Sequence, residues 1–412
     1  MIPVGQYKIL LINSLYKSKN KETIYPVGLY YLSLFLKKHF PDHYLQIFDM
    51  NLSKNPYQDL ERILSKYNFQ ITAISYRNLI RHSFLSKLAT KTIDFEKVTR
   101  ICKQIRPDMK IIIGGPAFAI DPEKVLKRFG NIDYGLVDNV GGMFAELIES
   151  NFNDHSVKNV YYRNKDQIIF SGYRSDDSFE NAITGFTVFP GLNAGDYDEI
   201  GIQTKKGCIF QCKHCPQKYL EGNKIRLRSV KTVIDEISFY LEMGVRNFYF
   251  TDSVFNYPNH YCMDLLQEII NKSLNISWSA FLKASYIDDD LAVLLLKSGC
   301  RKIDISAESG DDNILRYLNT NETVDSIINA AEILKNYPAI RICYYFLLGT
   351  EKENFSSLIK TMKLALRLRM KYKSEIYFST FNPINKTEVN VKCHNFIINT
   401  LSACISVFNQ LI

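Results

Sequence analysis

The chain has 412 residues, 46% of them hydrophobic and 23% charged, and its 51 Lys and Arg against 43 Asp and Glu give a formal net charge of +8. This length exceeds one ordinary core and suits two domains, and the charge is spread without basic blocks interleaved with aromatic residues, so we expect no nucleic-acid partner. No window reaches the ~18 uninterrupted apolar residues of a membrane span. The start has no signal-peptide form, so we expect a cytoplasmic protein.

Nine cysteines raise the question of disulfide bonds. Six are scattered along the chain in mostly apolar surroundings, which favours buried free thiols over disulfide pairs. These six are Cys102, Cys262, Cys300, Cys343, Cys393 and Cys404. The other three are clustered in one loop.

Strands and helices alternate through the first 150 residues. Short apolar runs predict strands, and apolar residues at helical spacing predict helices. The predicted strands are 8–13, 45–49, 71–75, 111–115 and 132–137, and the predicted helices are 26–37, 57–67, 95–105, 122–129 and 143–149. Continuous apolar strands in this alternation indicate an α/β domain with a Rossmann-like, doubly wound parallel sheet covered on both faces.

Polar residues and glycines follow these strands. Ligands of open parallel sheets bind beyond the carboxyl ends of the strands. The candidates at these ends are Asn13, Ser14, Asp49, Asn51, Ser75, Arg77, Asn78, Gly114, Gly115, Asp138 and Asn139. Gly114 and Gly115 fit a tight turn without a ligand equally well, and each of the others taken alone is a weak indication.

A connector follows the first domain. Residues 157–171 predict a hairpin turned by Asn164-Lys-Asp166. A polar stretch, 172–198, then contains Pro190 and three glycines, which is typical of a linker. We therefore place the domain boundary in residues 151–198.

Three cysteines, Cys208, Cys212 and Cys215, lie within eight residues, directly after a strand-like run and a turn residue, Gly207. The C-x3-C-x2-C spacing lets a short loop wrap its thiolates round one face of an iron-sulfur cube, whereas a tetrahedral zinc site needs a fourth ligand. His214 is a possible fourth ligand, but neighbouring side chains such as those of His214 and Cys215 seldom converge on one ion. Zinc and chance clustering remain as less favoured alternatives.

The alternation resumes in longer units after the linker. The predicted strands are 199–204, 246–251, 276–281, 302–306, 340–348 and 375–379, and the predicted helices are 230–243, 259–271, 289–297, 311–318, 324–334 and 355–370. Six such units indicate a partial (β/α)6 TIM-type barrel with its chemistry at the carboxyl ends of the strands. We expect domains at 1–150 and 199–380, the connector at 151–198, and a short C-terminal extension at 381–412.

The extension contains a predicted amphipathic helix, 393–411, with Ile397, Leu401, Ile405 and Phe408 on one stripe. Such a helix closes the open side of the barrel or binds a partner.

The cysteine motif after a strand resembles the radical S-adenosylmethionine (SAM) superfamily, in which three cysteines hold a [4Fe-4S] cluster and SAM binds the fourth iron. The family often has an aromatic residue before the last cysteine, where this chain has His214. The resemblance implies that Cys208, Cys212 and Cys215 bind the cluster and that His214 packs on the adenine side of SAM.

Other barrel strand ends resemble the SAM-binding segments of the same family. The resemblance implies that Asp252 and Ser253 meet the methionyl amine and that Lys283 meets the carboxylate, which needs a charge partner in a dry site. It implies further that the Glu308-Ser309-Gly310 segment approaches the ribose and that the segment 346–351, which contains Gly349, packs on adenine. An ordinary capped turn between strand and helix is the alternative at each position.

Together with this barrel, the first domain resembles the cobalamin-binding module of class B radical SAM proteins. The matching segments are 26–29, the strand ending at Asp49, 75–78, 114–118 and 122–123. Two departures stand out: the Asp-x-His-x-x-Gly signature, whose His ligates cobalt in some B12 enzymes, is absent, and 137–141 lacks the usual acidic turn. The resemblance implies cobalamin at the strand-end candidates other than Ser14, and a domain that has lost B12 is the alternative.

The resemblance also implies a reaction. An electron from the reduced cluster cleaves SAM, and the 5'-deoxyadenosyl radical takes a hydrogen from an unactivated carbon, to which methylcobalamin then passes a methyl group. The expected substrate is a small molecule, lipid or peptide methylated at a carbon or phosphinate-type centre. The expected electron donor is a protein such as flavodoxin or ferredoxin.

Two other functions remain open from sequence. One is a radical SAM cyclase, oxidase or rearrangement enzyme that uses B12 differently or not at all. The other is a cluster-bearing structural or regulatory protein without turnover. The mass of the product separates the first from a methyltransferase, and reductive cleavage of SAM excludes the second.

Overall fold

The computed structural model describes residues 6–15, 23–76, 91–138, 140–165, 167–174, 183–381 and 388–389. The chain divides into two compact units. Among the described residues, the first unit comprises 6–206 and 225–249, and the second comprises 207–224 and everything from Phe250 onward. This division does not test the domain boundaries expected from the sequence, which stay a prediction.

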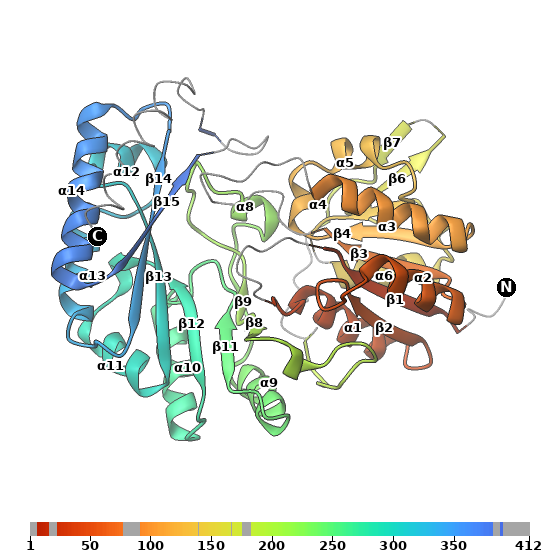
Figure 1. Cartoon of the computed structure of the whole chain (residues 1–412), viewed down its shortest axis with the longest axis horizontal. Helices are drawn as coiled ribbons and strands as arrows, with labels where there is room; N and C mark the ends of the chain where they lie inside the picture. The colour runs from red at the N-terminus through yellow and green to blue at the C-terminus, as the bar shows by residue number, and fades with distance from the viewer. Residues whose placement is uncertain are drawn as a thin grey trace. The chain divides into compact units, whose positions relative to one another are not determined.

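A seven-stranded sheet in the order β2-β1-β3-β4-β5-β6-β7 forms the centre of the first unit (Figure 1). Its strands are β1 (Lys8–Asn13), β2 (Tyr44–Asp49), β3 (Ile71–Ser75), β4 (Lys110–Gly114), β5 (Tyr134–Leu136), β6 (Val160–Asn164) and β7 (Gln167–Phe170). The first five pair in parallel, and β6 and β7 extend the sheet as an antiparallel hairpin. This arrangement confirms the predicted parallel sheet and the hairpin after it.

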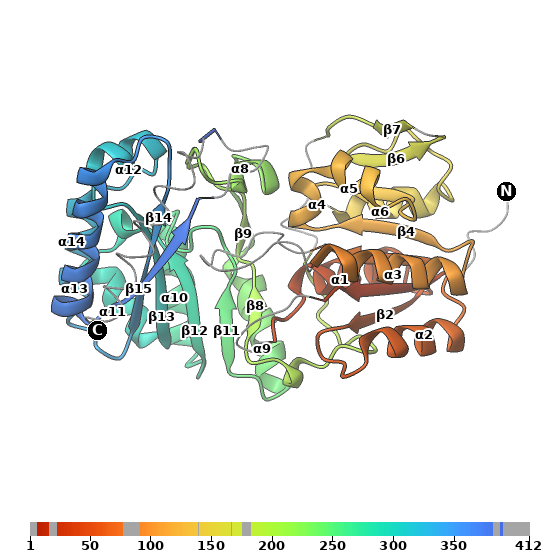
Figure 2. The ribbon, with the colours of Figure 1, turned by 45° about the horizontal axis from the view of Figure 1, so that its top comes forward.

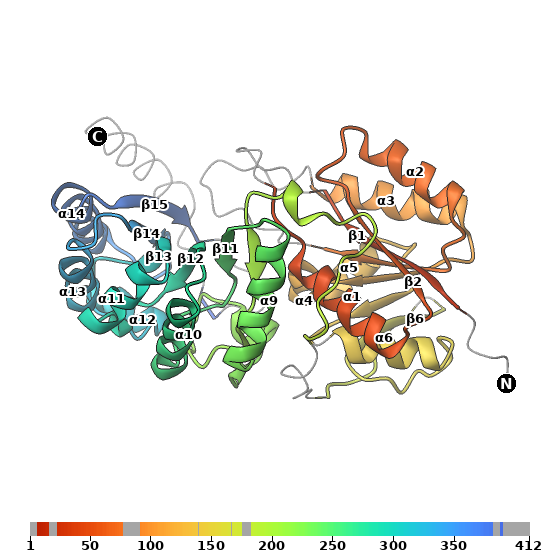
Figure 3. The same ribbon diagram turned by 90° about the horizontal axis from the view of Figure 1, so that it is seen from below.

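Helices cover both faces of this sheet. They are α1 (Val27–His39), α2 (Pro56–Lys66), α3 (Lys91–Ile105), α4 (Pro116–Ile120), α5 (Pro122–Arg128) and α6 (Val140–Glu149). Figure 3 shows α2 and α3 on one face and α1 and α6 on the other. Strand β1 is buried at every residue after its first, as two covered faces require, whereas the edge strand β2 alternates between buried and half-buried residues.

The first unit also contains the elements that lead into the second sheet. They are η2 (Ala194–Asp196), β8 (Ile200–Ile202), β9 (Lys205–Lys206), β10 (Arg226–Leu227), α9 (Val230–Glu242) and β11 (Asn247–Phe250), the last of which ends at the boundary. Strands β9 and β10 form a two-residue antiparallel ladder. Helix α9 begins at Ser229, whose side chain accepts a hydrogen bond from the Thr232 amide and so caps the helix.

The second sheet has six strands in the order β15-β14-β13-β12-β11-β8. The strands of the second unit are β12 (Ser277–Leu282), β13 (Cys300–Glu308), β14 (Arg341–Leu348) and β15 (Glu375–Thr380), and they pair in parallel (Figure 2). Its helices are α8 (Gln217–Leu220), α10 (Asn259–Asn271), η3 (Ala284–Tyr286), α11 (Asp289–Lys297), α12 (Asp312–Leu318), α13 (Val324–Leu334) and α14 (Phe355–Tyr372). Six strands with intervening helices confirm the predicted partial barrel.

Sequence patterns missed the shortest elements. The two-residue strands β9 and β10 and the single-turn helices α4 and α8 are too short to show a periodicity, so no pattern indicates them. The expected strand 302–306 is longer in the structure, since β13 runs from Cys300 to Glu308. The predicted C-terminal helix, 393–411, lies outside the described residues, and within the described chain no helix is long and apolar enough to cross a bilayer.

Candidate active site

The cysteine loop belongs entirely to the second unit. It begins at Gly207, whose φ of +96° lies in the left-handed region that glycine adopts without strain. The Cys208 amide donates to the Gly222 carbonyl at 3.0 Å, and the Lys213 amide donates to the Leu318 carbonyl at 2.9 Å. These two backbone bonds tie both sides of the loop in place.

The three thiols of the loop are not joined in disulfide bonds and are at least half-buried. Burial raises the pKa of Cys212 to about 11 and that of Cys215 to about 12. Electrostatic interactions with Cys208 raise both pKa values further, and Lys283 opposes the rise at Cys212. The thiols are therefore close enough to act on one another, and they need a positive metal centre to become thiolates at neutral pH.

The loop also bears on the choice between a cluster and a zinc ion. In the described part of the chain, no three His, Cys, Asp or Glu side chains are grouped as ligands of a metal ion. In a cluster each thiolate binds a different iron, so the three sulfurs stand further apart than the ligands of one zinc ion. The assignment of the three cysteines to a cluster therefore stays a prediction from their spacing in the sequence.

His214 and Glu308 meet within the second unit, with His214 Nε2 lying 3.2 Å from Glu308 Oε1. Glu308 ends β13 with a φ of +58°, after a register shift between Ser306 and Glu308. Such an irregularity changes the direction in which a strand-end side chain points. The structure thus brings together two residues predicted from separate motifs.

Lys283 follows β12 and has several partners of its own. Its ammonium forms an ion pair with Glu322 at 3.2 Å, donates to the Thr320 carbonyl, and lies 4.6 Å from the centre of the Phe210 ring. Asn256 holds the backbone of Lys283, since it donates to the Lys283 carbonyl and accepts from the Lys283 amide, both at 2.9 Å. Sequence analysis missed Glu322 and Asn256, because neither belongs to a recognisable motif.

Asp252 and Ser253 follow β11 at the start of the second unit. Asp252 is 2% exposed, and the Ser253 hydroxyl donates to Glu221 Oε2 at 2.9 Å. Glu221 follows α8, directly after the cysteine loop. The segment predicted to bind the amine is therefore hydrogen-bonded to the segment that follows the cysteine loop.

The three remaining SAM-site candidates differ in setting. Ser309 is fully buried and hydrogen-bonds to Thr361 of α14 at 3.1 Å, and a Cβ added at Gly310 would lie 2.5 Å from the Lys360 carbonyl oxygen. These two residues pack the end of β13 on α14. Gly349 has a φ of +91°, and its amide donates to Glu353 at 2.6 Å.

The cobalamin candidates lie at the carboxyl edge of the first sheet. Strand register places Asn13 beside Asp49 and beside Ser75, and Ser75 beside Gly114, so the four form one row. The predicted strand ends therefore do meet at one edge. Arg77, Asn78 and Asn139 lie outside the described residues.

Asp49 is already fully engaged at this edge. It accepts hydrogen bonds from the Asn13 Nδ2, from the Asn51 amide and Nδ2, and from the Tyr197 hydroxyl, at 2.8–2.9 Å. Four donors satisfy the carboxylate. Asp49 therefore organises the edge rather than offering free acceptors, and Tyr197, from the connector, was missed because the linker shows no pattern.

One group at this edge, the side-chain oxygen of Asn13, remains open to a ligand, whereas Gly115 and Asp138 are engaged within the protein. The Asn13 Oδ1 is buried and has no hydrogen-bond partner in the described part of the chain. Gly115 has a φ of +101°, and a Cβ there would lie 2.8 Å from the Tyr76 carbonyl oxygen, so only glycine fits. An orphaned acceptor suits a ligand edged with amide N–H donors, as a corrin is. Asp138, by contrast, forms an ion pair with Lys206 at 2.9 Å.

Comparisons with known proteins agree with this geometry. The family model of the radical SAM superfamily matches residues 202–365, and that of the B12 binding domain matches residues 14–148. An uncharacterized methyltransferase of Pyrococcus horikoshii is 24% identical over 84% of this chain and 74% of its own length. The hopanoid C-2 methylase of Rhodopseudomonas palustris is 25% identical over 43% of this chain, which spans 32% of that enzyme.

Solved structures of similar fold point the same way. The methyltransferase TsrM of Kitasatospora setae, solved with cobalamin and a [4Fe-4S] cluster bound, has a TM-score of 0.78 and 18% identity, over 93% of this chain and 77% of that one. The cobalamin-dependent radical enzyme OxsB has a TM-score of 0.73 and 16% identity over 98% of this chain and 56% of that one. At these identities the likeness concerns the fold. With both family models matched in order, this chain belongs to the radical SAM superfamily, as a member with an N-terminal B12-binding domain.

Proposed function

We propose that this protein is a cobalamin-dependent radical SAM methyltransferase that methylates an unactivated carbon or a phosphinate centre. The observation that carries the proposal is the loop of Cys208, Cys212 and Cys215 beside His214, Glu308 and Lys283, in a chain that also has a B12-binding domain. The relatives named above as methyltransferases support methyl transfer as the reaction.

The residues of the chain have distinct tasks in this function. Cys208, Cys212 and Cys215 hold the cluster, which together with bound SAM and cobalamin supplies radical and methyl-transfer chemistry. Lys283 meets the carboxylate of SAM, and the polar groups of His214 and Glu308 meet its adenosine part. Burial of these side chains keeps water away from the site and strengthens their electrostatic interactions.

Two partners complete the proposal. The substrate is a small molecule, or a lipid or peptide presented in the same way. The electron comes from a donor protein such as flavodoxin or ferredoxin.

The test is anaerobic reconstitution of the full chain with iron, sulfide and hydroxocobalamin, followed by desalting. We expect about one cobalamin per chain to remain by its absorption spectrum and SAM to be consumed after reduction. A protein that keeps its iron but loses all cobalamin on desalting contradicts the methyltransferase and favours a radical SAM enzyme that works without B12.

A further inference from the structure

Helix α14 differs in charge from the other long helices of the second unit. It carries no acidic residue. Its cations are Lys360, Lys363, Arg367, Arg369 and Lys371. Helices α10 and α13, by contrast, carry acidic residues and no Lys or Arg. A chain with a net charge of +8 therefore concentrates much of its excess positive charge in this one helix.

Two of these cations are not balanced by an anion. Lys371 forms an ion pair with Glu332, and Lys360 forms one with Asp311 at 2.9 Å. Lys363 and Arg367 are both exposed, and neither has an acidic partner among the residues that the structure describes. Their two positive charges are therefore available to an anionic partner.

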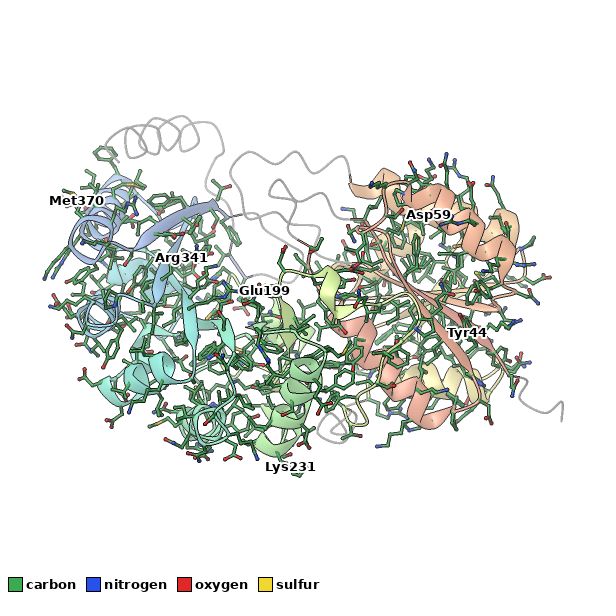
Figure 4. The ribbon with its side chains drawn as sticks, turned by 60° about the horizontal axis from the view of Figure 1, so that its bottom comes forward. Tyr44, Asp59, Glu199, Lys231, Arg341 and Met370 are labelled. Carbon is green, nitrogen blue, oxygen red and sulfur yellow. The ribbon has the colours of Figure 1, made fainter. Side chains whose placement is uncertain are left out.

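The exposed side of α14 also carries large apolar residues. Phe355 is 67% exposed, Ile359 39% and Met370 78%, and Met370 lies on the side of the helix that faces away from the sheet (Figure 4). At 3.6 residues per turn, the three residues fall within a sector of about 60° along a helix of about 27 Å. A single exposed apolar residue is ordinary, but these three form a line, which we call the apolar stripe.

The apolar stripe and the two available cations lie next to each other. Counted around the helix from Phe355, Lys363 and Arg367 lie at about 80° and 120°, beside the sector of the stripe. The buried residues Leu364 and Leu368 lie at about 180° and 220°. The part of α14 that is farthest from the core therefore presents apolar groups and positive charges together.

An anionic membrane matches both properties of this surface. The boundary between lipid head groups and acyl chains takes up apolar side chains, and anionic head groups attract Lys and Arg. A nucleic acid pairs its phosphates with cations such as Lys363 and Arg367 but leaves the apolar stripe in water. A membrane accounts for the stripe as well as for the charges.

We infer that α14 is a docking surface for a membrane that contains anionic lipids. The helix lies on the bilayer, since none of the described helices is long and apolar enough to cross one. The inference goes beyond the proposed function and does not depend on it, because it uses no residue that is proposed to hold the cluster, SAM or cobalamin.

Flotation of the reconstituted full chain with lipid vesicles tests the inference. One set of vesicles contains phosphatidylcholine alone, and the other contains phosphatidylcholine and phosphatidylserine in equal parts, both in about 0.1 M salt. We expect the chain to bind the anionic vesicles at least about tenfold more strongly, because each Lys or Arg near such a surface adds to the attraction. Equal binding to both sets overturns the inference, whether a second copy of the chain or its own residues beyond 389 cover the helix.

Charge-reversal variants locate the electrostatic part of the binding. Lys363→Glu with Arg367→Glu should weaken binding to the anionic vesicles at least about tenfold. The matched control, Lys272→Glu with Lys297→Glu, makes the same change in net charge at exposed positions near the ends of α10 and α11. It should weaken binding less than about threefold, since charges away from the docking surface are screened by salt. Equal losses in the two double variants contradict docking through α14.

A second pair of variants tests the apolar part. Phe355→Ser with Met370→Ser should weaken binding to the anionic vesicles at least about fivefold, because less apolar surface leaves water. The control, Val293→Ser with Leu296→Ser, changes two apolar residues of α11 that are 36% and 41% exposed and should leave binding unchanged. All of these substitutions are at exposed positions, and circular dichroism checks that each variant keeps its fold. Binding that survives the loss of Phe355 and Met370 shows that charge alone attracts the chain, and it refutes the docking surface.

Discussion

At the scale of single residues, Lys283 and Glu322 show how the group that we propose to bind SAM is held within the protein. Their side chains are 12% and 2% exposed, so each charge depends on the other. Breaking a buried ion pair by removing one partner leaves the other charge without compensation, which costs more than the pair itself contributes. In the proposed function Lys283 therefore combines a structural role with the binding of SAM, and a single substitution does not separate the two.

A double substitution separates the two roles. We expect Lys283→Met to lower the free energy of unfolding by on the order of 3 kcal/mol, and Lys283→Met with Glu322→Gln to recover most of this loss. Neither variant should bind SAM, because both lack the partner of its carboxylate. Urea unfolding and equilibrium dialysis with SAM measure the two effects, and recovery of SAM binding in the double variant contradicts the role of Lys283.

The raised pKa of Cys212 predicts an unusual reactivity in the cluster-free protein. The thiolate is the reactive form, and a pKa of about 11 means that its fraction keeps growing as pH rises from 8 to 10. We expect the rate of alkylation of Cys212 by iodoacetamide to rise about tenfold per pH unit over this range, whereas a thiol of ordinary pKa levels off above ~9. Peptide mass spectrometry measures the rate, and an early plateau at Cys212 contradicts the expected burial.

The three loop cysteines should differ sharply from the buried ones elsewhere. Replacing Cys208, Cys212 or Cys215 with Ala should abolish the ~400 nm absorbance of a Cys-ligated cluster after reconstitution. Cys102→Ala and Cys300→Ala are the controls, since both thiols are buried and neither belongs to the motif. A cluster that survives in all three loop variants contradicts the ligand assignment.

At the scale of elements, helix α9 and strand β9 are held by ion pairs that differ in burial. Arg228, just before α9, lies 2.7 Å from Glu236 of the helix, and both side chains are fully buried. The Tyr31 hydroxyl of α1 donates to the same carboxylate at 3.3 Å. On β9, Lys206 pairs with Asp138 at side-chain exposures of 13% and 30%.

The exposure of the side chains decides how much each ion pair contributes to the free energy of unfolding. We expect Arg228→Met to destabilise the protein by on the order of 3–5 kcal/mol, because it leaves Glu236 buried without a partner. Asp138→Asn should cost less than about 1 kcal/mol, and Asn also tolerates the φ of +68° at this position. Chemical denaturation measures the loss of free energy of unfolding in both variants. Equal losses contradict this ranking.

Sequence patterns predict the elements of this protein better than the contacts of its sites. Apolar runs mark the central strands of the first sheet, β1, β3 and β4, because covered parallel strands are buried on both faces. The partners of the site residues come from segments far apart in the sequence: Glu322 reaches Lys283 from the start of α13, and Tyr197 reaches Asp49 from the linker. Packing, not a local pattern, makes these contacts.

At the scale of the whole molecule, the family assignment depends on two features that appear in order along the chain. The cysteine motif identified the radical SAM domain from sequence because cluster ligation needs three thiols in one short loop. The cobalamin site is harder to predict, because its groups are single residues at the ends of different strands, and in the structure Asp49 and Asp138 are occupied by partners within the protein.

The most direct test of the account follows the methyl group of SAM. The reconstituted full chain is incubated anaerobically with cobalamin, reductant and SAM carrying a trideuterated methyl group, and the protein-bound cobalamin is analysed by mass spectrometry. The account predicts that a SAM molecule remethylates the cobalt, so that the trideuteromethyl group is recovered on the bound cobalamin. Cobalamin that stays bound but never acquires the label, in a protein with an intact cluster, contradicts methyl transfer as its function.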